Sequence, residues 1–249
     1  MNARFYAPDV QATGEVAALP DEEAQHLTQV LRLKAGDAVR VFNGRGGEFD
    51  AVVESVGRNG VAVRVGAPRE PAREARVALT LAQAVLKGDR MDDAVRDAVM
   101  IGVAAIQPII TVRTEVTRAA LGRGGRTERW QRVAVSSAKQ CGRAVVPAIR
   151  EPLSFEILVQ AIAAARLPGR ALMLVEPTAS AQAIALRDIE LAPPRAATLV
   201  IGPEGGWTTE EIHAAAGACS LLTLGGRIIR ADAMATVAIS ALFARWGEF

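Results

Sequence analysis

The chain has 249 residues, 50% of them hydrophobic and 22% charged, so it is long enough for two modest domains with buried cores. Cys141 and Cys219 lack CxxC spacing, and the two histidines lack metal-ligand spacing, so we expect neither a disulfide framework nor a metal centre. The sequence has no run of about 18 uncharged apolar residues and no signal-peptide core. It therefore predicts a cytoplasmic protein that has no membrane partner and uses an organic cofactor.

Positive charge is concentrated in one segment. Residues 113–150 hold nine Lys or Arg and two Glu, a net charge of +7, which leaves −5 for the remainder because the whole chain carries +2. Neutralising phosphates supplies most of the affinity of proteins for nucleic acids, so the segment favours a polyanionic partner. A solvated, arginine-rich surface explains the composition equally well.

The first 70 residues predict a small, barrel-like, antiparallel β-domain. A helix is expected over residues 21–33, where apolar residues recur at spacings of three or four. Strands are expected at 39–42, 48–56 and 61–65, with turn residues between them. Residues 66–76 combine two prolines with many charges and read as a linker. The boundary therefore separates domains at 1–70 and 71–249.

The second domain alternates strands with helices, which is typical of an α/β fold with a mostly parallel sheet. Strands are expected at 77–85, 105–112, 171–175, 197–201 and 221–224. Helices are expected at about 89–102, 127–142 and 233–246.

One motif joins a buried strand to a glycine-rich turn and a helix. It reads Ile201-Gly202-Pro203-Glu204-Gly205-Gly206-Trp207, and Thr208 with Glu211 has the spacing of a helix capping box. The turn lies at the carboxyl end of a strand, where open α/β sheets bind ligands. Three glycines expose the backbone to close approach, and together with a proline they are more than a tight turn without any ligand, the alternative interpretation, would need.

A second glycine-led loop also joins a strand to a helix. It reads Leu224-Gly225-Gly226-Arg227-Ile228-Ile229-Arg230-Ala231-Asp232-Ala233. Neither loop has a GxGxxG or GxxxxGK[ST] pattern, so the pyrophosphate-binding motifs are poorly supported. Two such loops at adjacent strand ends could hold one flat cofactor by contacts to its adenine and ribose.

Short matches along the whole chain identify a family resemblance. They are His26-x-x-x-Val30-Leu31-Arg32, Leu86-Lys87, Gly102-Val103, Glu128-Arg129-Trp130, Gln140-Cys141-Gly142-Arg143, Ile201 to Gly206, and Leu224-Gly225 with Arg227 and Arg230. Each is weak alone, but in this order and spacing they resemble the RsmE family of 16S rRNA (uracil-N3)-methyltransferases in the SPOUT superfamily.

The resemblance implies a PUA-like domain, then a trefoil-knotted methyltransferase domain, in a homodimer that binds S-adenosylmethionine and acts on 16S rRNA or the small ribosomal subunit. The implied cofactor-binding residues are Ile201, Gly202, Pro203, Glu204, Gly205, Gly206, Leu224, Gly225, Arg227, Ile228 and Ile229. The residues expected to face RNA are Arg32, Arg123, Arg126, Arg129, Lys139 and Arg143.

Arg230 and Asp232 are the expected catalytic residues. Arg230 would stabilise the negative charge that the uracil imide acquires, and Asp232 would hold that arginine or accept the proton, with bulk water as the other acceptor. The apolar run 237–243 suggests a dimer interface, or packing within one subunit. A ribose 2′-O-methyltransferase and a non-catalytic ribosome-assembly factor are the alternatives.

The chain departs from the family pattern near the expected site. Asp97 and Met100 replace a charged Lys and Glu, and Ala231-Asp232-Ala233 replaces Thr-Glu-Thr. These changes bear on the activity and the target nucleotide.

Overall fold

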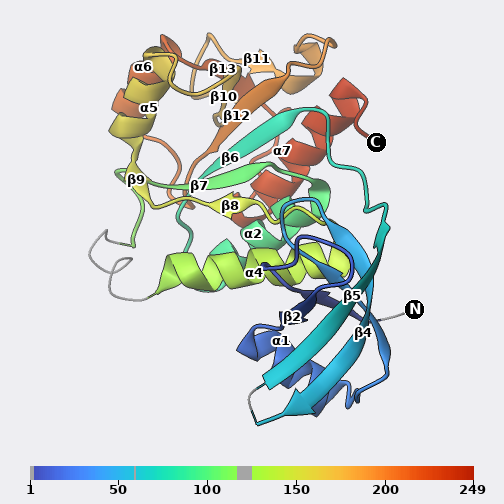
Figure 1. Cartoon of the computed structure of the whole chain (residues 1–249). Helices are drawn as coiled ribbons and strands as arrows, with labels where there is room; N and C mark the ends of the chain where they lie inside the picture. Colours follow the sequence, from blue (N-terminus) through green and yellow to red (C-terminus); the bar gives the residue numbers. More distant parts are fainter. Residues whose placement is uncertain (1–2, 59, 117–124) are drawn as a thin grey trace. The chain divides into compact units, whose positions relative to one another are not determined.

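The computed structural model describes residues 3–58, 60–116 and 125–249, and it divides into two compact units (Figure 1). The first contains Met1–Glu74 and Val135–Val146, and the second contains Ala75–Ala134 and Pro147–Phe249. The division falls inside helix α4 (Arg126–Cys141), so the carboxyl-terminal part of that helix belongs to the first unit. None of the described helices is long and apolar enough to cross a membrane.

The first unit is a five-stranded sheet in the order β1-β3-β4-β5-β2. Its strands are β1 (Arg4–Tyr6), β2 (Val16–Ala18), β3 (Ala38–Phe42), β4 (Glu48–Gly57) and β5 (Gly60–Arg69). Alternate residues along β4 and β5 point into a core that includes Phe5, Val41 and Val63, so the predicted hairpin and third strand are confirmed. The all-antiparallel prediction is wrong, because β1 pairs with β3 in parallel.

The predicted linker over 66–76 is also partly wrong. β5 continues through Arg69, which pairs in register with Glu48 of β4. Pro68 is tolerated in this strand because it pairs next to an irregularity in the register, at a point where the ladder tolerates a missing N–H. The domain boundary between residues 70 and 71 stays a prediction.

The helix expected over residues 21–33 is present as two consecutive segments of different helical type. Helix α1 (Asp21–Gln25) is regular, whereas η1 (His26–Val30) is a π-helix. The hydroxyl of Thr28 donates to the Ala24 carbonyl at 2.8 Å, a back-bond that competes with the regular backbone ladder. Apolar spacing could predict the helix but not this change of pitch.

The π-helix ends at a strained residue. Arg32 has φ +56°, the left-handed region that favours glycine, and the Leu33 N–H donates to the Leu27 carbonyl at 3.0 Å across it. The preceding Val30 and Leu31 are 67% and 41% exposed. An arginine and two apolar side chains therefore lie on the surface at this helix end.

The second unit is an eight-stranded sheet in which every neighbouring pair is parallel. The strand order is β11-β13-β10-β12-β6-β7-β8, and β9 also pairs with β7. The strands are β6 (Ala78–Ala84), β7 (Ala105–Ile110), β8 (Ala148–Ile149), β9 (Leu153–Ser154), β10 (Arg170–Leu174), β11 (Ile184–Ala185), β12 (Ala196–Ile201) and β13 (Ser220–Thr223). The sheet type and all five strands expected in this domain are confirmed.

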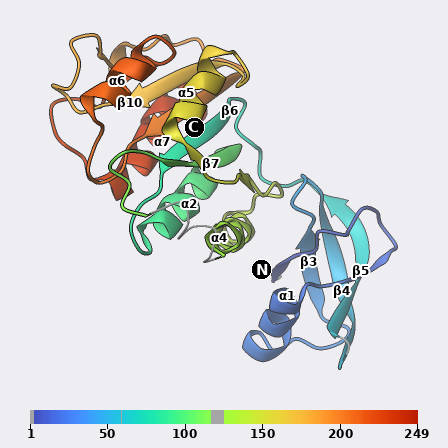
Figure 2. The same cartoon turned by 90° about the vertical axis from the view of Figure 1, so that its left-hand side faces the viewer.

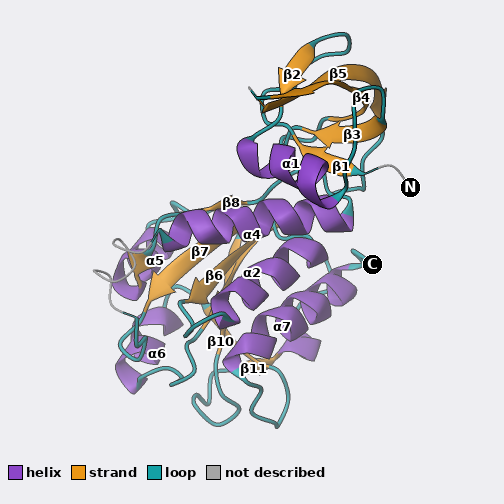
Figure 3. Cartoon of the chain, turned by 90° about the horizontal axis from the view of Figure 1, so that it is seen from below, coloured by secondary structure: helices purple, strands orange, loops and turns teal. Residues whose placement is uncertain are grey.

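Helices cover both faces of this sheet (Figures 2 and 3). α5 (Phe155–Ala163) and α6 (Thr209–Ala216) pack on the face that carries Ala82, Met173 and Val200. α2 (Arg90–Ile101) and α7 (Ala231–Trp246) lie side by side on the other face. The three helices predicted in this domain are present as α2, α4 and α7, whereas α5 was not predicted.

The apolar run of α7 is largely used within its own subunit. Ala238, Ile239, Leu242 and Phe243 are each at most 1% exposed, whereas Val237 is 40% exposed. These buried side chains fill the layer between α7 and the sheet, so the run by itself gives no support for a dimer interface.

A buried ion pair holds the first unit together. The Arg4 guanidinium donates to a Glu48 carboxylate oxygen at 2.9 Å and to the carbonyls of Ala138, at 2.8 Å, and Arg143, at 2.7 Å. The two side chains are only 11% and 7% exposed. Arg4 thus joins the edge strand β1 to the carbonyl groups at the end of α4, a favourable place for a cation.

We predict that Arg4→Met destabilises the protein by about 3–5 kcal/mol, because it leaves the buried Glu48 carboxylate and several carbonyls without their partner. The matched control is Arg64→Met, whose ion pair with Glu54 is exposed (52% and 39%) and should contribute at most about 1 kcal/mol. Urea denaturation followed by circular dichroism measures both. Equal losses in the two variants would contradict the role given to Arg4.

Candidate active site

A cavity of about 340 Å³ lies at the carboxyl ends of three neighbouring parallel strands, β13, β10 and β12. Its size is within the range of small-molecule sites, and such strand ends are where parallel sheets bind ligands. Of the residues predicted for the site, those that line the cavity are Ile201, Gly202, Pro203, Glu204, Gly206, Leu224, Arg227, Ile228, Ile229, Arg230 and Asp232. The structure therefore brings the two glycine loops together around one cavity.

Two predicted cofactor-binding glycines do not line it. A Cβ on Gly205 would lie 3.0 Å from the Cβ of Arg113, on the side of a neighbouring loop. Gly225 has φ +84° and open space around it, so its lack of a side chain serves the loop conformation. Both glycines shape the loops, and other residues present the surface to a ligand.

Sequence reasoning missed several cavity residues, among them Arg90, Leu174, Glu176, Pro177 and Met234. Leu174, Glu176 and Pro177 come from the end of β10, which lies between β12 and β13. The expected strand at 171–175 was a signal for them, but its place in the sheet could not be obtained from the pattern alone.

The turn after β12 requires glycine at the positions closest to the cavity. Gly206 has φ +69°, and a Cβ there would collide with the Glu176 carboxylate. A Cβ on Gly202 would lie 2.9 Å from the Trp207 ring. Bare backbone and apolar side chains such as Leu174 and Ile229 thus form the wall, which fits a flat, nucleoside-type cofactor.

Side chains fasten this turn on both sides. The capping box of Thr208 and Glu211 is confirmed, and Glu211 Oε1 also accepts the N–H of Val112 at 2.9 Å. The Trp207 indole N–H donates to the Leu174 carbonyl at 2.7 Å, so it joins the turn to the end of β10. Two walls of the cavity are therefore held together by one buried hydrogen bond.

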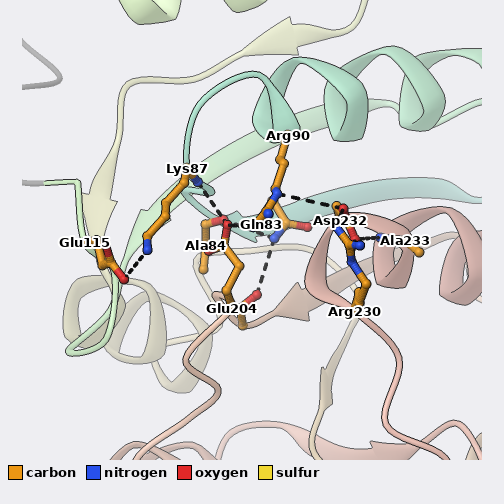
Figure 4. A network of polar contacts seen from close by, with 10 residues as sticks. Gln83, Ala84, Lys87, Arg90, Glu115, Glu204, Arg230, Asp232 and Ala233 are labelled. Atoms are coloured by element: carbon orange, nitrogen blue, oxygen red, sulfur yellow. Dashed lines mark hydrogen bonds and ion pairs between the residues drawn. The ribbon is translucent and has the colours of Figure 1, made fainter.

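Charged groups form a network beside the turn (Figure 4). Glu204 Oε1 accepts the backbone N–H of Lys87 at 3.1 Å and Nη1 of Arg90 at 3.2 Å. Arg230 donates to both carboxylate oxygens of Asp232, at 3.2 and 2.6 Å. The prediction that Asp232 holds Arg230 is confirmed.

Burial tends to raise the pKa of Asp232, but its hydrogen bonds and ion pairing with Arg230 outweigh that effect and lower the pKa below the usual value. The carboxylate is therefore ionised at neutral pH and accepts a proton poorly. No group of His, Cys, Asp or Glu among the described residues is arranged to hold a metal ion.

The residues predicted to face RNA have different environments. Arg32 is exposed, and Arg129 is exposed but paired with Asp89 and Asp92. Lys139 is paired with Glu23 at 2.8 Å and is 19% exposed. Arg126 lies at the start of α4, and Arg123 falls outside the described residues.

Arg143, also predicted to face RNA, is the most buried of these residues that the structure describes. Its side chain is only 6% exposed, and its Nε donates to both carboxylate oxygens of Glu74 at 3.1 Å. The residue is buried in the first unit, where its charge is compensated within the protein. Its place in a basic stretch of sequence gave no sign of that partner.

Comparison with known proteins defines the class to which this fold and site belong. Residues 73–243 match the RNA methyltransferase domain family, and residues 19–66 match the RNA methyltransferase PUA domain. The chain thus has the two parts of a PUA-containing RNA methyltransferase.

Relatives narrow the class further. The ribosomal RNA small subunit methyltransferase E of Synechocystis is 32% identical over 96% of this chain and 77% of the relative, and that of Mycobacterium bovis is 31% identical over 97% and 92%. A Neisseria gonorrhoeae structure of the same enzyme, bound to S-adenosylmethionine, has TM-score 0.86 and 30% identity over 99% of this chain and 98% of its own. A Legionella pneumophila methyltransferase with the same bound cofactor has TM-score 0.87 and 33% identity over 98% of both chains. The chain belongs to the ribosomal RNA small subunit methyltransferase E family.

We predict that Trp207→Phe costs about 1–3 kcal/mol, because it leaves the buried Leu174 carbonyl without its donor, and that it weakens cofactor binding by loosening two cavity walls. Trp246→Phe is the matched control, since Trp246 is equally buried and its indole N–H has no partner among the described residues. Urea denaturation and calorimetric titration with S-adenosylmethionine check both effects. Similar behaviour of the two variants would rule out the role assigned to this hydrogen bond.

Proposed function

We propose that this protein transfers a methyl group from S-adenosylmethionine to the ring nitrogen N3 of a uridine in 16S ribosomal RNA. The observation that carries the proposal is the single cavity formed by both glycine loops, with Arg230 and Asp232 at its edge. Relatives of this chain are named as small-subunit rRNA methyltransferases, and two similar structures contain S-adenosylmethionine.

The groups that would hold the cofactor are the backbone of the turn from Gly202 to Gly206 and the apolar side chains around that turn. When bound, S-adenosylmethionine supplies the methyl group: the N3 electron pair forms the new C–N bond, the C–S bond breaks with its electron pair going to sulfur, and the imide proton goes to water. The protein's own task is to position the base and stabilise its negative charge.

Arg230 is the proposed stabilising group. Its guanidinium is 74% exposed and is held by Asp232, so its direction is fixed while it remains accessible. An attack by nitrogen needs no covalent enzyme intermediate, which agrees with a cavity whose lining contains no cysteine.

The remaining parts of the proposal concern partners. We assign RNA binding to a first domain at 1–70 and catalysis to a domain at 71–249. The homodimer and the trefoil knot stay predictions from the family resemblance. A substrate in the small ribosomal subunit would place the activity in the cytoplasm.

We predict that 16S rRNA from cells lacking this protein contains no N3-methyluridine at the target site, and that the purified protein with S-adenosylmethionine restores it. Mass spectrometry of digested nucleosides measures the product. A 2′-O-methylated nucleoside would instead establish the ribose alternative. Cofactor binding without any methyl transfer to rRNA or small subunits would favour the non-catalytic assembly factor.

We predict that Arg32→Gln weakens RNA binding and reduces the slope of log affinity against log salt by about one, because an exposed arginine that contacts a phosphate releases about one counterion. Arg143→Gln should instead mainly lower stability, since that side chain is buried against Glu74. Filter binding at several salt concentrations and urea denaturation separate the two effects. An unchanged salt slope in Arg32→Gln would remove this residue from the RNA-binding surface.

A further inference from the structure

Arg90 lines the cavity but comes from a third part of the chain. It is the first residue of α2, which follows β6, and β6 is the sheet neighbour of β12. Its side chain is 45% exposed, so a ligand in the cavity can reach the guanidinium. No motif in the sequence assigned it a role.

The Arg90 guanidinium lies between acidic groups from both glycine loops (Figure 4). Nη1 donates to Glu204 Oε1 at 3.2 Å, and Nε is 4.0 Å from Asp232 Oδ2. Among the described residues, Nη2 has no partner. The two acids therefore fix the direction of the side chain while donors remain for a ligand.

Asp232 is shared between two arginines. It accepts two hydrogen bonds from Arg230 and lies within ion-pair distance of Arg90. With Glu204 the four side chains are neutral overall, so the folded protein tolerates the cluster with no further anion. Donors fixed before the reaction are the kind that stabilise charge as it develops.

The chemistry of the uracil imide calls for two such donors. When N3 loses its proton to water, the negative charge spreads onto the two carbonyl oxygens that flank N3 on opposite sides. One arginine can serve only one of these oxygens well, whereas two arginines of separate origin can serve both. A ribose hydroxyl, by contrast, would develop charge on a single oxygen.

We propose that Arg90 and Arg230 together form the site for the uracil anion, and that Asp232 is a positioning residue that holds both arginines and is not the proton acceptor. This inference rests on the proposed function and adds a second substrate-contacting residue to it.

Other charged groups face the same space. Glu176, at the end of β10, and Arg227, in the loop after β13, also line the cavity. Lys87 is paired with Glu115 at 2.5 Å. None of these is joined to Asp232 by a hydrogen bond or ion pair, so the two arginines dominate its surroundings.

The test is the pH dependence of single-turnover methyl transfer to 16S rRNA or small subunits that lack the modification. We expect Arg90→Ala to lower the rate about a hundredfold at neutral pH. The pH at which the rate rises should increase by about one unit, because the loss of a positive charge makes the imide harder to deprotonate. Arg90→Lys should recover part of the rate, and Asp232→Asn should lower the rate at every pH, because both arginines lose the group that orients them.

Arg96→Ala is the matched control, since Arg96 lies on the exposed side of the same helix and pairs with Asp93 and Asp97 away from the cavity. Its profile should match that of the unchanged protein. An unchanged rate and profile in Arg90→Ala would overturn the inference. So would an Asp232→Asn variant that loses rate at neutral pH but regains the full rate at high pH, because a missing base is no longer needed once the imide has lost its proton to the solvent.

Calorimetry distinguishes a role of Arg90 in cofactor binding from a role in binding the uracil anion. If Arg90 held the cofactor carboxylate, Arg90→Ala would weaken binding of S-adenosylmethionine but not of 5′-methylthioadenosine, which lacks that carboxylate, and the inference would fail. Binding of both ligands within about threefold of the unchanged protein is the expected result. If the unchanged protein binds cofactor but forms no N3-methyluridine, the proposed function fails together with the inference. Normal product with an unaltered Arg90→Ala profile rejects the inference alone.

Discussion

The position of β10 between β12 and β13 is the constraint on which the site depends. All three strands run in parallel, so their carboxyl ends meet at one edge of the sheet and deliver three loops to the same cavity. The Trp207 indole then fixes the first of these loops to the end of β10. Without that strand order, the two glycine-rich loops would be separate turns with no common ligand.

The sequence predicted the regular elements because their signals are local. Alternating apolar residues marked β3, β4 and β5, and Thr208 with Glu211 marked the start of α6. The π-helix at His26–Val30 was missed, because apolar spacing does not encode a change of helical pitch; the Thr28 hydroxyl, within this segment, donates to the backbone carbonyl of Ala24. Arg90 was missed for another reason: its neighbours in the cavity are more than 80 residues away in sequence, and strand order alone brings them together.

The basic segment shows how net charge can mislead when it is counted along the chain. Arg129, Lys139 and Arg143 are paired with acids that lie outside that segment, namely Asp89, Glu23 and Glu74. Much of the local excess is therefore neutralised within each unit, and the positive surface open to a polyanion is smaller than the composition implies. Arg32, outside the segment, is exposed, and only the family resemblance predicted that it faces RNA.

The backbone of Arg32 has a consequence for how this protein can be improved or can evolve. A left-handed conformation in a residue with a side chain costs about 1–3 kcal/mol, which glycine would largely recover. A selection for thermal resistance alone should therefore enrich glycine or asparagine at this position and discard the guanidinium. With the RNA-facing role proposed for Arg32, laboratory evolution for heat tolerance would yield more stable proteins that bind RNA less tightly, a trade-off located at a single position.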